Sequence, residues 1–133
     1  MPPTIGVPGR ILVVEDEGLI ADYIAAVLRK AGHEVVGVVA SSEEVFARTP
    51  ELRPDVILMD IRIEGPLDGI QTVAKLRETL DIPVIYLSAH SDRATIDRAR
   101  AAGACEVIYK PLNSSKLLAA IKGCIERSHA VHP

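Results

Sequence analysis

A short β-branched, apolar run followed by an amphipathic stretch occurs five times along this chain, and this repeat limits the folds that the chain can adopt. The apolar runs have the length of strands and lie at residues 11–14, 35–39, 55–59, 84–87 and 107–109. Between them, apolar residues recur at the helical spacings of three and four, which indicates helices with one buried face. Alternating strands and helices predict an α/β fold whose parallel sheet is joined by right-handed crossovers.

The apolar character of each run predicts its place in the sheet. Runs 11–14, 55–59 and 84–87 are almost wholly apolar, which is typical of parallel strands covered on both faces. Gly37 interrupts the second run and Glu106 adjoins the fifth, as strands at an edge tolerate. Edges at the second and fifth strands give the order 2-1-3-4-5, a flavodoxin-like, doubly wound (βα)5 sheet. In that order, a ligand site is expected beyond the carboxyl ends of the first and third strands.

Capping and breaking residues set the expected limits of the helices. Ser41 or Ser42 is predicted to cap a short second helix that Pro50 and Pro54 close. The fourth helix, expected at 92–102, has the weakest apolar face, built from one isoleucine and small alanines. The last helix is predicted to begin at Asn113 or Ser114.

Composition narrows the class of protein. The 133 residues suit one domain, and no apolar run approaches the ~20 residues that cross a bilayer. We expect residues 10–128 to form that domain, between a flexible arm at 1–9 and a tail at 129–133. With a net charge of -3 and scattered Lys and Arg, the chain is not expected to bind nucleic acid or membranes. Cys105 and Cys124 lack a CxxC spacing, and the plain interpretation is a reduced, cytoplasmic protein.

Polar residues leave the carboxyl ends of four expected strands. Glu15 and Asp16 follow the first strand, Asp60 the third, Ser88 the fourth and Lys110 the fifth. Taken singly, each has a plain explanation, such as a helix cap, a turn residue or a solvated lysine. Together they predict an acidic cluster, a hydroxyl and an amine around one crevice.

The three carboxylates of this cluster are expected to repel one another. At ~4 Å each pair costs about 1 kcal/mol in water and about 4 kcal/mol at an effective dielectric constant of about 20. Such a cluster must raise a pKa or hold a cation. An oxygen-rich site with open positions suits Mg²⁺, which keeps several of its waters.

Four short motifs occupy these strand ends in order: Val13-Val14-Glu15-Asp16, Met59-Asp60, Leu87-Ser88-Ala89 and Tyr109-Lys110-Pro111. With them the chain resembles, over about residues 10–128, the receiver domain of bacterial two-component response regulators, in its chemotaxis-regulator-like form. The four motifs in register on five strand–helix units are highly specific.

The resemblance implies a phosphoacceptor that switches partner binding and is not an enzyme. Asp60 would take a phosphoryl group from a sensor histidine kinase or a phosphotransfer protein. Ser88 would bond that group, Lys110 would pair with its oxygens, and the Lys110–Pro111 bond would be cis. The implied Mg²⁺ ligands are Asp16, Asp60 and the backbone carbonyl of Arg62, with Glu15 assisting through water. Output would pass through the fourth helix, fifth strand and fifth helix to a downstream protein or a second copy.

Three positions depart from the usual pattern of that family. Val107 stands where the family usually carries an aromatic rotamer switch, which calls the usual coupling through a tyrosine hydroxyl into question. Tyr109 faces the same side of the strand, and either replaces that ring in part or only packs beside the fifth helix. The loop at 61–69 is one residue longer than the commonest form, as in a known subgroup, and Ser88 replaces the commonest threonine.

Other functions remain open on the sequence. A haloacid-dehalogenase-type phosphatase also uses an aspartate after an apolar strand, but needs a second acid two residues on, where this chain has Arg62. A receiver-like module that binds partners without being phosphorylated would not need Asp60, Ser88 and Lys110. A flavodoxin or a P-loop nucleotide binder is disfavoured, because three acidic residues after the first strand would repel phosphate.

Overall fold

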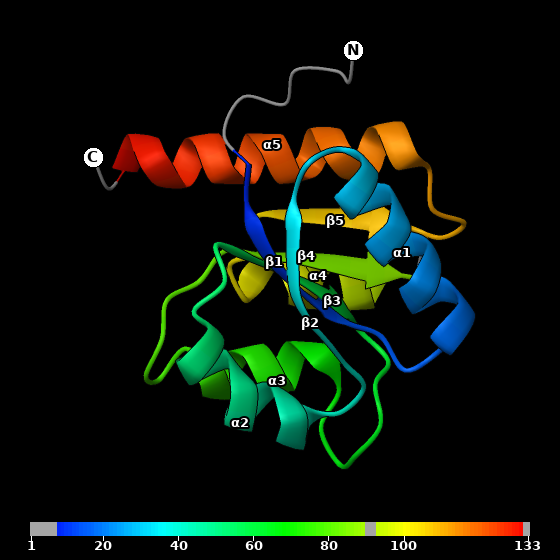
Figure 1. Cartoon of the computed structure of the whole chain (residues 1–133). Helices are drawn as coiled ribbons and strands as arrows, with labels where there is room; N and C mark the ends of the chain where they lie inside the picture. The colour runs from blue at the N-terminus through cyan, green and yellow to red at the C-terminus, as the bar shows by residue number, and fades with distance from the viewer. Residues whose placement is uncertain (1–7, 90–92, 132–133) are drawn as a thin grey trace.

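The computed structural model describes residues 8–89 and 93–131, along which strands and helices alternate (Figure 1). The strands are β1 (Arg10–Val14), β2 (Glu34–Val39), β3 (Val56–Asp60), β4 (Val84–Ser88) and β5 (Glu106–Tyr109). The helices are α1 (Gly18–Lys30), α2 (Ser42–Leu52), α3 (Gly69–Leu76), α4 (Arg93–Ala101) and α5 (Ser114–Val131). Each predicted apolar run therefore forms a strand, with ends displaced by one residue at most.

The strands form one parallel sheet in the order β2-β1-β3-β4-β5, which confirms the predicted fold class. Every residue of β3 and β4 is buried, as expected for central strands covered on both faces. Strand pairing aligns Val14 with Met59, Asp60 with Leu87, and Ser88 with Tyr109. The carboxyl ends of β1, β3, β4 and β5 therefore meet at one edge of the sheet.

Two layers of helices cover the sheet. In Figure 1, α1 and α5 lie on one face, and α2, α3 and α4 lie on the other. Side chains alternate along each strand, so Ile11 and Val13 pack with α1 and α5, whereas Leu12 and Val14 pack with the other layer. Within the described part of the chain, no helix has the length and apolar character that crossing a membrane requires.

Two of the predicted helix caps are present. The Ser41 side chain accepts a hydrogen bond from the Glu44 N–H (3.3 Å) at the start of α2. The Asn113 side chain accepts one from the Lys116 N–H (3.1 Å) at the start of α5. Both bonds satisfy backbone donors that the first turn of a helix leaves without a partner.

The prediction that Pro50 closes α2 is wrong. Pro50 lies inside the helix, which ends at Leu52. A proline so near the end removes only a late backbone donor. The Arg53 N–H still donates to the Thr49 carbonyl (2.9 Å), and Arg53, in the left-handed region (φ 45°), ends the helix.

The expected arm and tail fall partly outside the described residues, at 1–7 and 132–133. Of the expected arm, the structure describes Gly9, which is buried and whose N–H donates to His33 Nδ1 (2.9 Å). The packed structure therefore begins before β1. At the other end, α5 includes residues 129–131, which the sequence had placed in the tail.

The prediction of two reduced cysteines is also wrong, because Cys105 and Cys124 form a disulfide with their Cα atoms 6.1 Å apart. Cys105 directly precedes β5, and α5 runs back along that strand (Figure 1). Four residues of strand advance about 13 Å and ten residues of helix return about 15 Å, so the two cysteines reach the same level. This pairing depends on the packing of α5 on β5, which a search for CxxC spacing does not detect.

Candidate functional site

A cleft of about 840 Å³ opens at the carboxyl edge of the sheet. Asp16, Asp60, Ser88 and Lys110 line it, and each comes from the end of a different strand. Glu15, which is 2% exposed, completes the group beside Asp60 and Lys110. The structure thus brings together the acidic, hydroxyl and amine side chains that the strand ends predicted.

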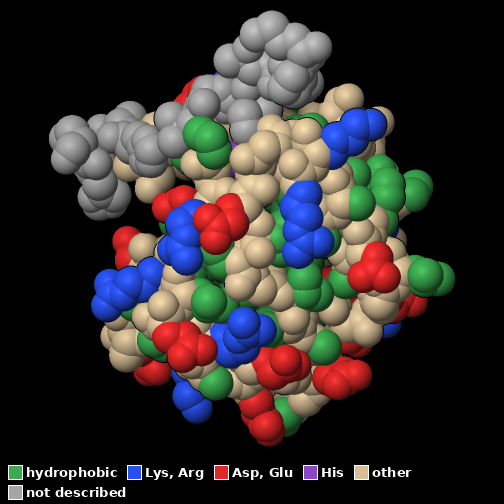
Figure 2. All heavy atoms as spheres, in the orientation of Figure 1, with side chains coloured by type: hydrophobic (Ala, Val, Ile, Leu, Met, Phe, Trp, Pro, Cys, Tyr) green, Lys and Arg blue, Asp and Glu red, His purple; other side chains and the backbone are tan. Residues whose placement is uncertain are grey.

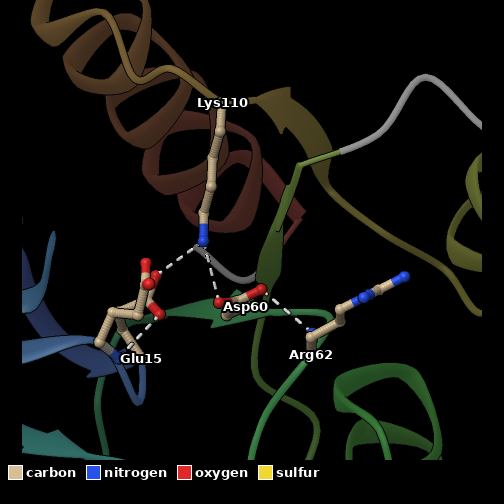
Figure 3. Close-up of polar contacts among 5 residues, drawn as sticks. Glu15, Asp60, Arg62 and Lys110 are labelled. Atoms are coloured by element: carbon tan, nitrogen blue, oxygen red, sulfur yellow. Dashed lines mark hydrogen bonds and ion pairs between the residues drawn. The ribbon is translucent and has the colours of Figure 1, made fainter.

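Lys110 joins the two buried carboxylates (Figure 3). Its Nζ donates to Glu15 Oε1 and to Asp60 Oδ2, both at 3.0 Å. The other oxygen of Asp60, Oδ1, accepts a bond from the Arg62 N–H (3.1 Å). The side chain of Glu15 is fully buried and that of Asp60 is 7% exposed, so these ion pairs are little screened by water.

The charges in this group do not balance. Burial, together with the neighbouring Asp60, raises the pKa of Glu15 to about 7, although the bond from Lys110 acts against the rise. Burial acts to lower the pKa of Lys110, but its bonds to Asp60 and Glu15 outweigh that effect and leave the pKa raised. One ammonium group therefore does not compensate the carboxylates around it, and Glu15 keeps part of its proton near neutral pH.

The acidic residues fit a divalent cation. Glu15, Asp16 and Asp60 each offer a carboxylate oxygen, and these oxygens lie within 4.8 Å of one another. When all three are ionised beside Lys110, the group carries two negative charges in excess, which is the charge that Mg²⁺ would neutralise. Asp16 is exposed, which leaves room for the waters that Mg²⁺ retains.

Gly69 packs closely against the backbone of Asp60, a contact that the sequence does not reveal. A Cβ at Gly69 would lie 2.3 Å from the Asp60 carbonyl oxygen and 2.8 Å from Met59 Cγ. The Gly69 N–H donates to the Ile61 carbonyl (2.6 Å), so the first residue of α3 packs directly on the end of β3. A glycine at a loop–helix junction is usually explained by turn geometry, which hides this close approach.

A second feature that the sequence does not reveal is an ion pair between two residues that line the cleft. Arg98 of α4 donates from Nη2 to Asp68 Oδ2 (2.9 Å), and both residues line the cleft. Asp68 caps α3 with a reciprocal pair of bonds to Gln71, at 2.8 and 2.9 Å. The cleft wall thus connects α4 to the loop that follows Asp60.

Val107 and Tyr109, the two positions proposed for a conformational switch, differ in exposure to solvent. Val107 is 8% exposed and packs in the core layer that contains α2, α3 and α4, whereas the Tyr109 ring is 45% exposed. Both line a groove of about 330 Å³ along β5 and the first half of α5. The position three residues before Lys110 therefore holds a buried aliphatic side chain, and the nearby ring faces solvent.

Figure 2 shows one face of the molecule, in the orientation of Figure 1. On that face, the Lys and Arg side chains are interspersed with Asp and Glu side chains. Among the residues coloured by type on this face, the positive charge is therefore spread among negative groups.

Comparison with known proteins agrees with this geometry. The family model described as the response regulator receiver domain matches residues 11–122. The transcriptional regulatory protein PdtaR of Mycobacterium tuberculosis is 35% identical over 121 residues, which are 91% of this chain and 58% of that protein. The DNA-binding response regulator MtrA of the same species is 30% identical over 119 residues, 90% of this chain and 51% of that protein. The chain thus spans little more than half the length of these relatives.

Solved structures show the same fold. The signal receiver domain of a modulated diguanylate cyclase from Desulfovibrio desulfuricans has a TM-score of 0.87 and 31% identity, covering 95% of this chain and all of that one. The response regulator PhyR from Brucella abortus has a TM-score of 0.81 and 28% identity, covering 94% of this chain and 51% of that one. The family match over most of the chain, the strand order and the acidic cleft lead to one conclusion: the chain belongs to the response regulator receiver domain family.

Proposed function

We propose that this chain is a phosphoacceptor in two-component signalling and that Asp60 is the residue phosphorylated. The observation that carries the proposal is the Asp60 carboxylate in the cleft, bonded to Lys110 and clustered with Glu15 and Asp16. In the reaction, a carboxylate oxygen of Asp60 attacks the phosphorus of a phosphohistidine. The P–N bond breaks, and the imidazole of the donor leaves.

The other residues of the cleft have separate roles in this proposal. Lys110 pairs with oxygens of the arriving phosphoryl group, and the hydroxyl of Ser88 donates to one of them once it is attached. Asp16, Asp60 and the backbone carbonyl of Arg62 would hold Mg²⁺, with Glu15 assisting. The charge that a bound Mg²⁺ would supply is the neutralisation that phosphoryl transfer requires. The protein holds Asp60 in place through β3 and through the close contact of Gly69. Lys110 lies directly after β5, and its bond to Pro111 is cis, as expected.

The phosphoryl donor is proposed to be a sensor histidine kinase or a phosphotransfer protein in the cytoplasm. Leu19 is 87% exposed and Tyr23 is 45% exposed, and their spacing of four residues places them on the same side of α1. Together with Lys110, Pro111 and Leu112 they line an apolar groove of about 260 Å³ beside the cleft. A partner seated there would hold its phosphohistidine close to Asp60.

Output is proposed to pass through α4, β5 and α5 to a downstream protein or a second copy of the chain. Of the nine residues of α4, only Ala99 is buried, so little apolar contact holds this helix in place. Tyr109 is exposed on β5, in the groove that β5 forms with α5. It is proposed to contact the partner, since Val107 provides no ring that could rotate between two positions.

The experiment is incubation of the chain with acetyl phosphate and Mg²⁺, followed by intact mass spectrometry. We expect a stable adduct of one phosphoryl group that is absent in Asp60→Asn. Asp81→Asn, an exposed aspartate before β4, is the matched control and should be phosphorylated as wild type.

Two outcomes contradict the proposal and separate its rivals. An unmodified wild-type mass would identify a module that binds without phosphorylation. Steady release of phosphate from general phosphomonoesters, without an adduct, would identify a phosphatase.

A further inference from the structure

The disulfide between Cys105 and Cys124 joins two elements of the proposed output surface. Cys105 stands directly before β5 and Cys124 lies in the third turn of α5. The bond closes the segment 105–124, which contains Lys110 and all eight residues that line the groove between β5 and α5. The bond therefore lies where it can restrain the position of α5 on β5.

The two sulfur-bearing residues differ in access to solvent. Cys124 is 1% exposed and packs with Leu117 and Ile121 in the layer that contains α1 and α5. Cys105 packs against the same cluster but is only partly buried. An external thiol can therefore approach Cys105 Sγ more readily than Cys124 Sγ.

Arg127 places a positive charge on both sulfurs. Its Nη2 lies 3.0 Å from Cys105 Sγ and 3.5 Å from Cys124 Sγ, and it also donates to the Cys105 carbonyl at 3.2 Å. Arg127 is exposed and forms no salt bridge among the described residues. Thiol–disulfide exchange passes through thiolates, which a neighbouring guanidinium stabilises.

We infer that Cys105 and Cys124 form a reversible redox site, with Cys105 as the sulfur that external thiols attack and with α5 as the element that the bond restrains. A low-molecular-weight thiolate attacks Cys105 Sγ, the S–S bond breaks, and Cys124 leaves as a thiolate and takes up a proton. A second thiolate attacks the external sulfur of the mixed disulfide and releases Cys105. Two external thiols become one disulfide, and the two electrons reduce the protein pair. The disulfide of the same class of thiol reverses the reaction.

The first test measures the redox state of the full chain in glutathione buffers of graded ratio. Thiols are trapped by alkylation and counted by intact mass. We expect a shift from the disulfide to two alkylated thiols as the buffer becomes reducing, and full return when oxidised glutathione is added. A pair that stays oxidised in reduced glutathione, or that never re-forms, overturns the inference.

The second test identifies the entry sulfur. Cys124→Ala should form a mixed disulfide with oxidised glutathione at Cys105 quickly, whereas Cys105→Ser should form one at Cys124 many times more slowly. Arg127→Gln should slow reduction of the wild-type disulfide several-fold, Arg127→Lys should retain most of the rate, and Arg29→Gln in α1 is the matched control. Equal rates in the two cysteine variants, or an unchanged rate in Arg127→Gln, contradict the assignment.

The third test concerns the restraint on α5. Amide hydrogen exchange of residues 114–128 should be faster in the reduced chain than in the oxidised chain, whereas exchange in α1 should not change. Equal exchange of α5 in the two states refutes the restraint. None of these measurements requires phosphorylation, so they stand or fall independently of the function proposed for Asp60.

Discussion

At the scale of single residues, the cleft is defined by carboxylates that one lysine does not neutralise. Asp60→Asn removes one of these charges while Lys110 keeps its bond to Glu15. In EDTA at pH 8, above the pKa of about 7 for Glu15, we expect this variant to have a higher melting temperature than wild type. Mg²⁺ at a hundredfold excess over its Kd should stabilise wild type by about 2.7 kcal/mol, and the variant much less.

Calorimetry of both proteins, with and without Mg²⁺, checks this expectation. Asp81→Asn again serves as the control and should respond to Mg²⁺ as wild type does. If Asp60→Asn melts lower in EDTA and gains as much from Mg²⁺ as wild type, the three carboxylates do not share a cation.

Tyr86 carries a buried polar group in the core. Its side chain is fully buried in β4, and its hydroxyl has no hydrogen-bond partner among the described residues. Burial raises its pKa to about 12, because the charged form would lose its hydration. Tyr86→Phe removes the unsatisfied group and should increase the free energy of unfolding by about 1 kcal/mol in urea titration. Tyr23→Phe, at an exposed ring, should change it little; a loss in Tyr86→Phe would show that the hydroxyl is bonded.

These residues show what the sequence could predict of the site. Glu15, Asp60 and Lys110 were found because parallel strands end at one edge, so a polar residue after each apolar run belongs to the same cleft. Gly69 and Tyr86 were not found, because their importance depends on a distance of a few ångströms between packed elements. No pattern along the chain encodes that distance.

At the scale of elements, the junction of β3 and α3 offers a sharp comparison of two glycines. Gly69 and Gly18 are each the first residue of a helix, but a Cβ would collide with β3 at Gly69 and meet nothing within 4 Å at Gly18. Gly69→Ala should lower the free energy of unfolding by about 1–3 kcal/mol, since the end of β3 must shift. Gly18→Ala should leave it unchanged or raise it by up to about 1 kcal/mol.

The same pair of variants tests whether α3 positions the phosphoacceptor. Labelling by acetyl phosphate should slow in Gly69→Ala and remain near the wild-type rate in Gly18→Ala. Equal stability and equal labelling in the two variants would mean that the backbone around Asp60 can shift to accept the extra methyl group without loss of stability or of reactivity.

The helix α4 is the element expected to respond to phosphorylation. It buries one residue, and its Arg98 is paired with Asp68 beside the cleft, so a change at Asp60 reaches it through few contacts. Amide exchange across Arg93–Ala101 should change when beryllofluoride, a phosphoryl mimic, is added with Mg²⁺. Unchanged exchange there, with changes confined to other elements, contradicts the proposed output surface.

The sequence predicts an element well where the spacing of its apolar residues determines it. It predicts poorly the features that depend on contacts between elements. The strands follow directly from apolar runs, and the chemistry of serine places the start of α2 at Ser41 or Ser42, of which the structure shows Ser41 to be the cap. The prediction for Pro50 was wrong because a proline usually breaks a helix. Near the end of α2, however, Pro50 removes only one backbone hydrogen-bond donor, and the helix continues to Leu52. The disulfide lay outside local signals altogether, since it needs the return of α5 along β5.

At the scale of the whole molecule, two buried groups give opposite dependences of stability on pH. The folded pKa of Glu15 is about 7, above its ordinary 4.5, so its contribution is fully present below pH 4.5 and is lost as pH rises to 7. Burial lowers the pKa of His33 below its ordinary 6.5, and its Nδ1 accepts the Gly9 N–H. Below pH 6.5 the imidazole of His33 is protonated more readily in the unfolded chain than in the folded chain, so the free energy of unfolding falls as the pH drops.

These opposite signs can be separated by measurement in EDTA and in Mg²⁺. In EDTA the two contributions oppose each other below pH 6.5, so the urea midpoint of wild type should change less with pH there than it does in Mg²⁺. In saturating Mg²⁺, the folded state holds Glu15 ionised, and the midpoint should fall steadily on acidification. His33→Gln removes only the histidine contribution, so the gap in stability between wild type and this variant should narrow as pH falls from 7 to 5 in both solutions. A gap that stays constant with pH would show that His33 titrates alike in the folded and unfolded chains, and that its bond to Gly9 does not depend on a neutral ring.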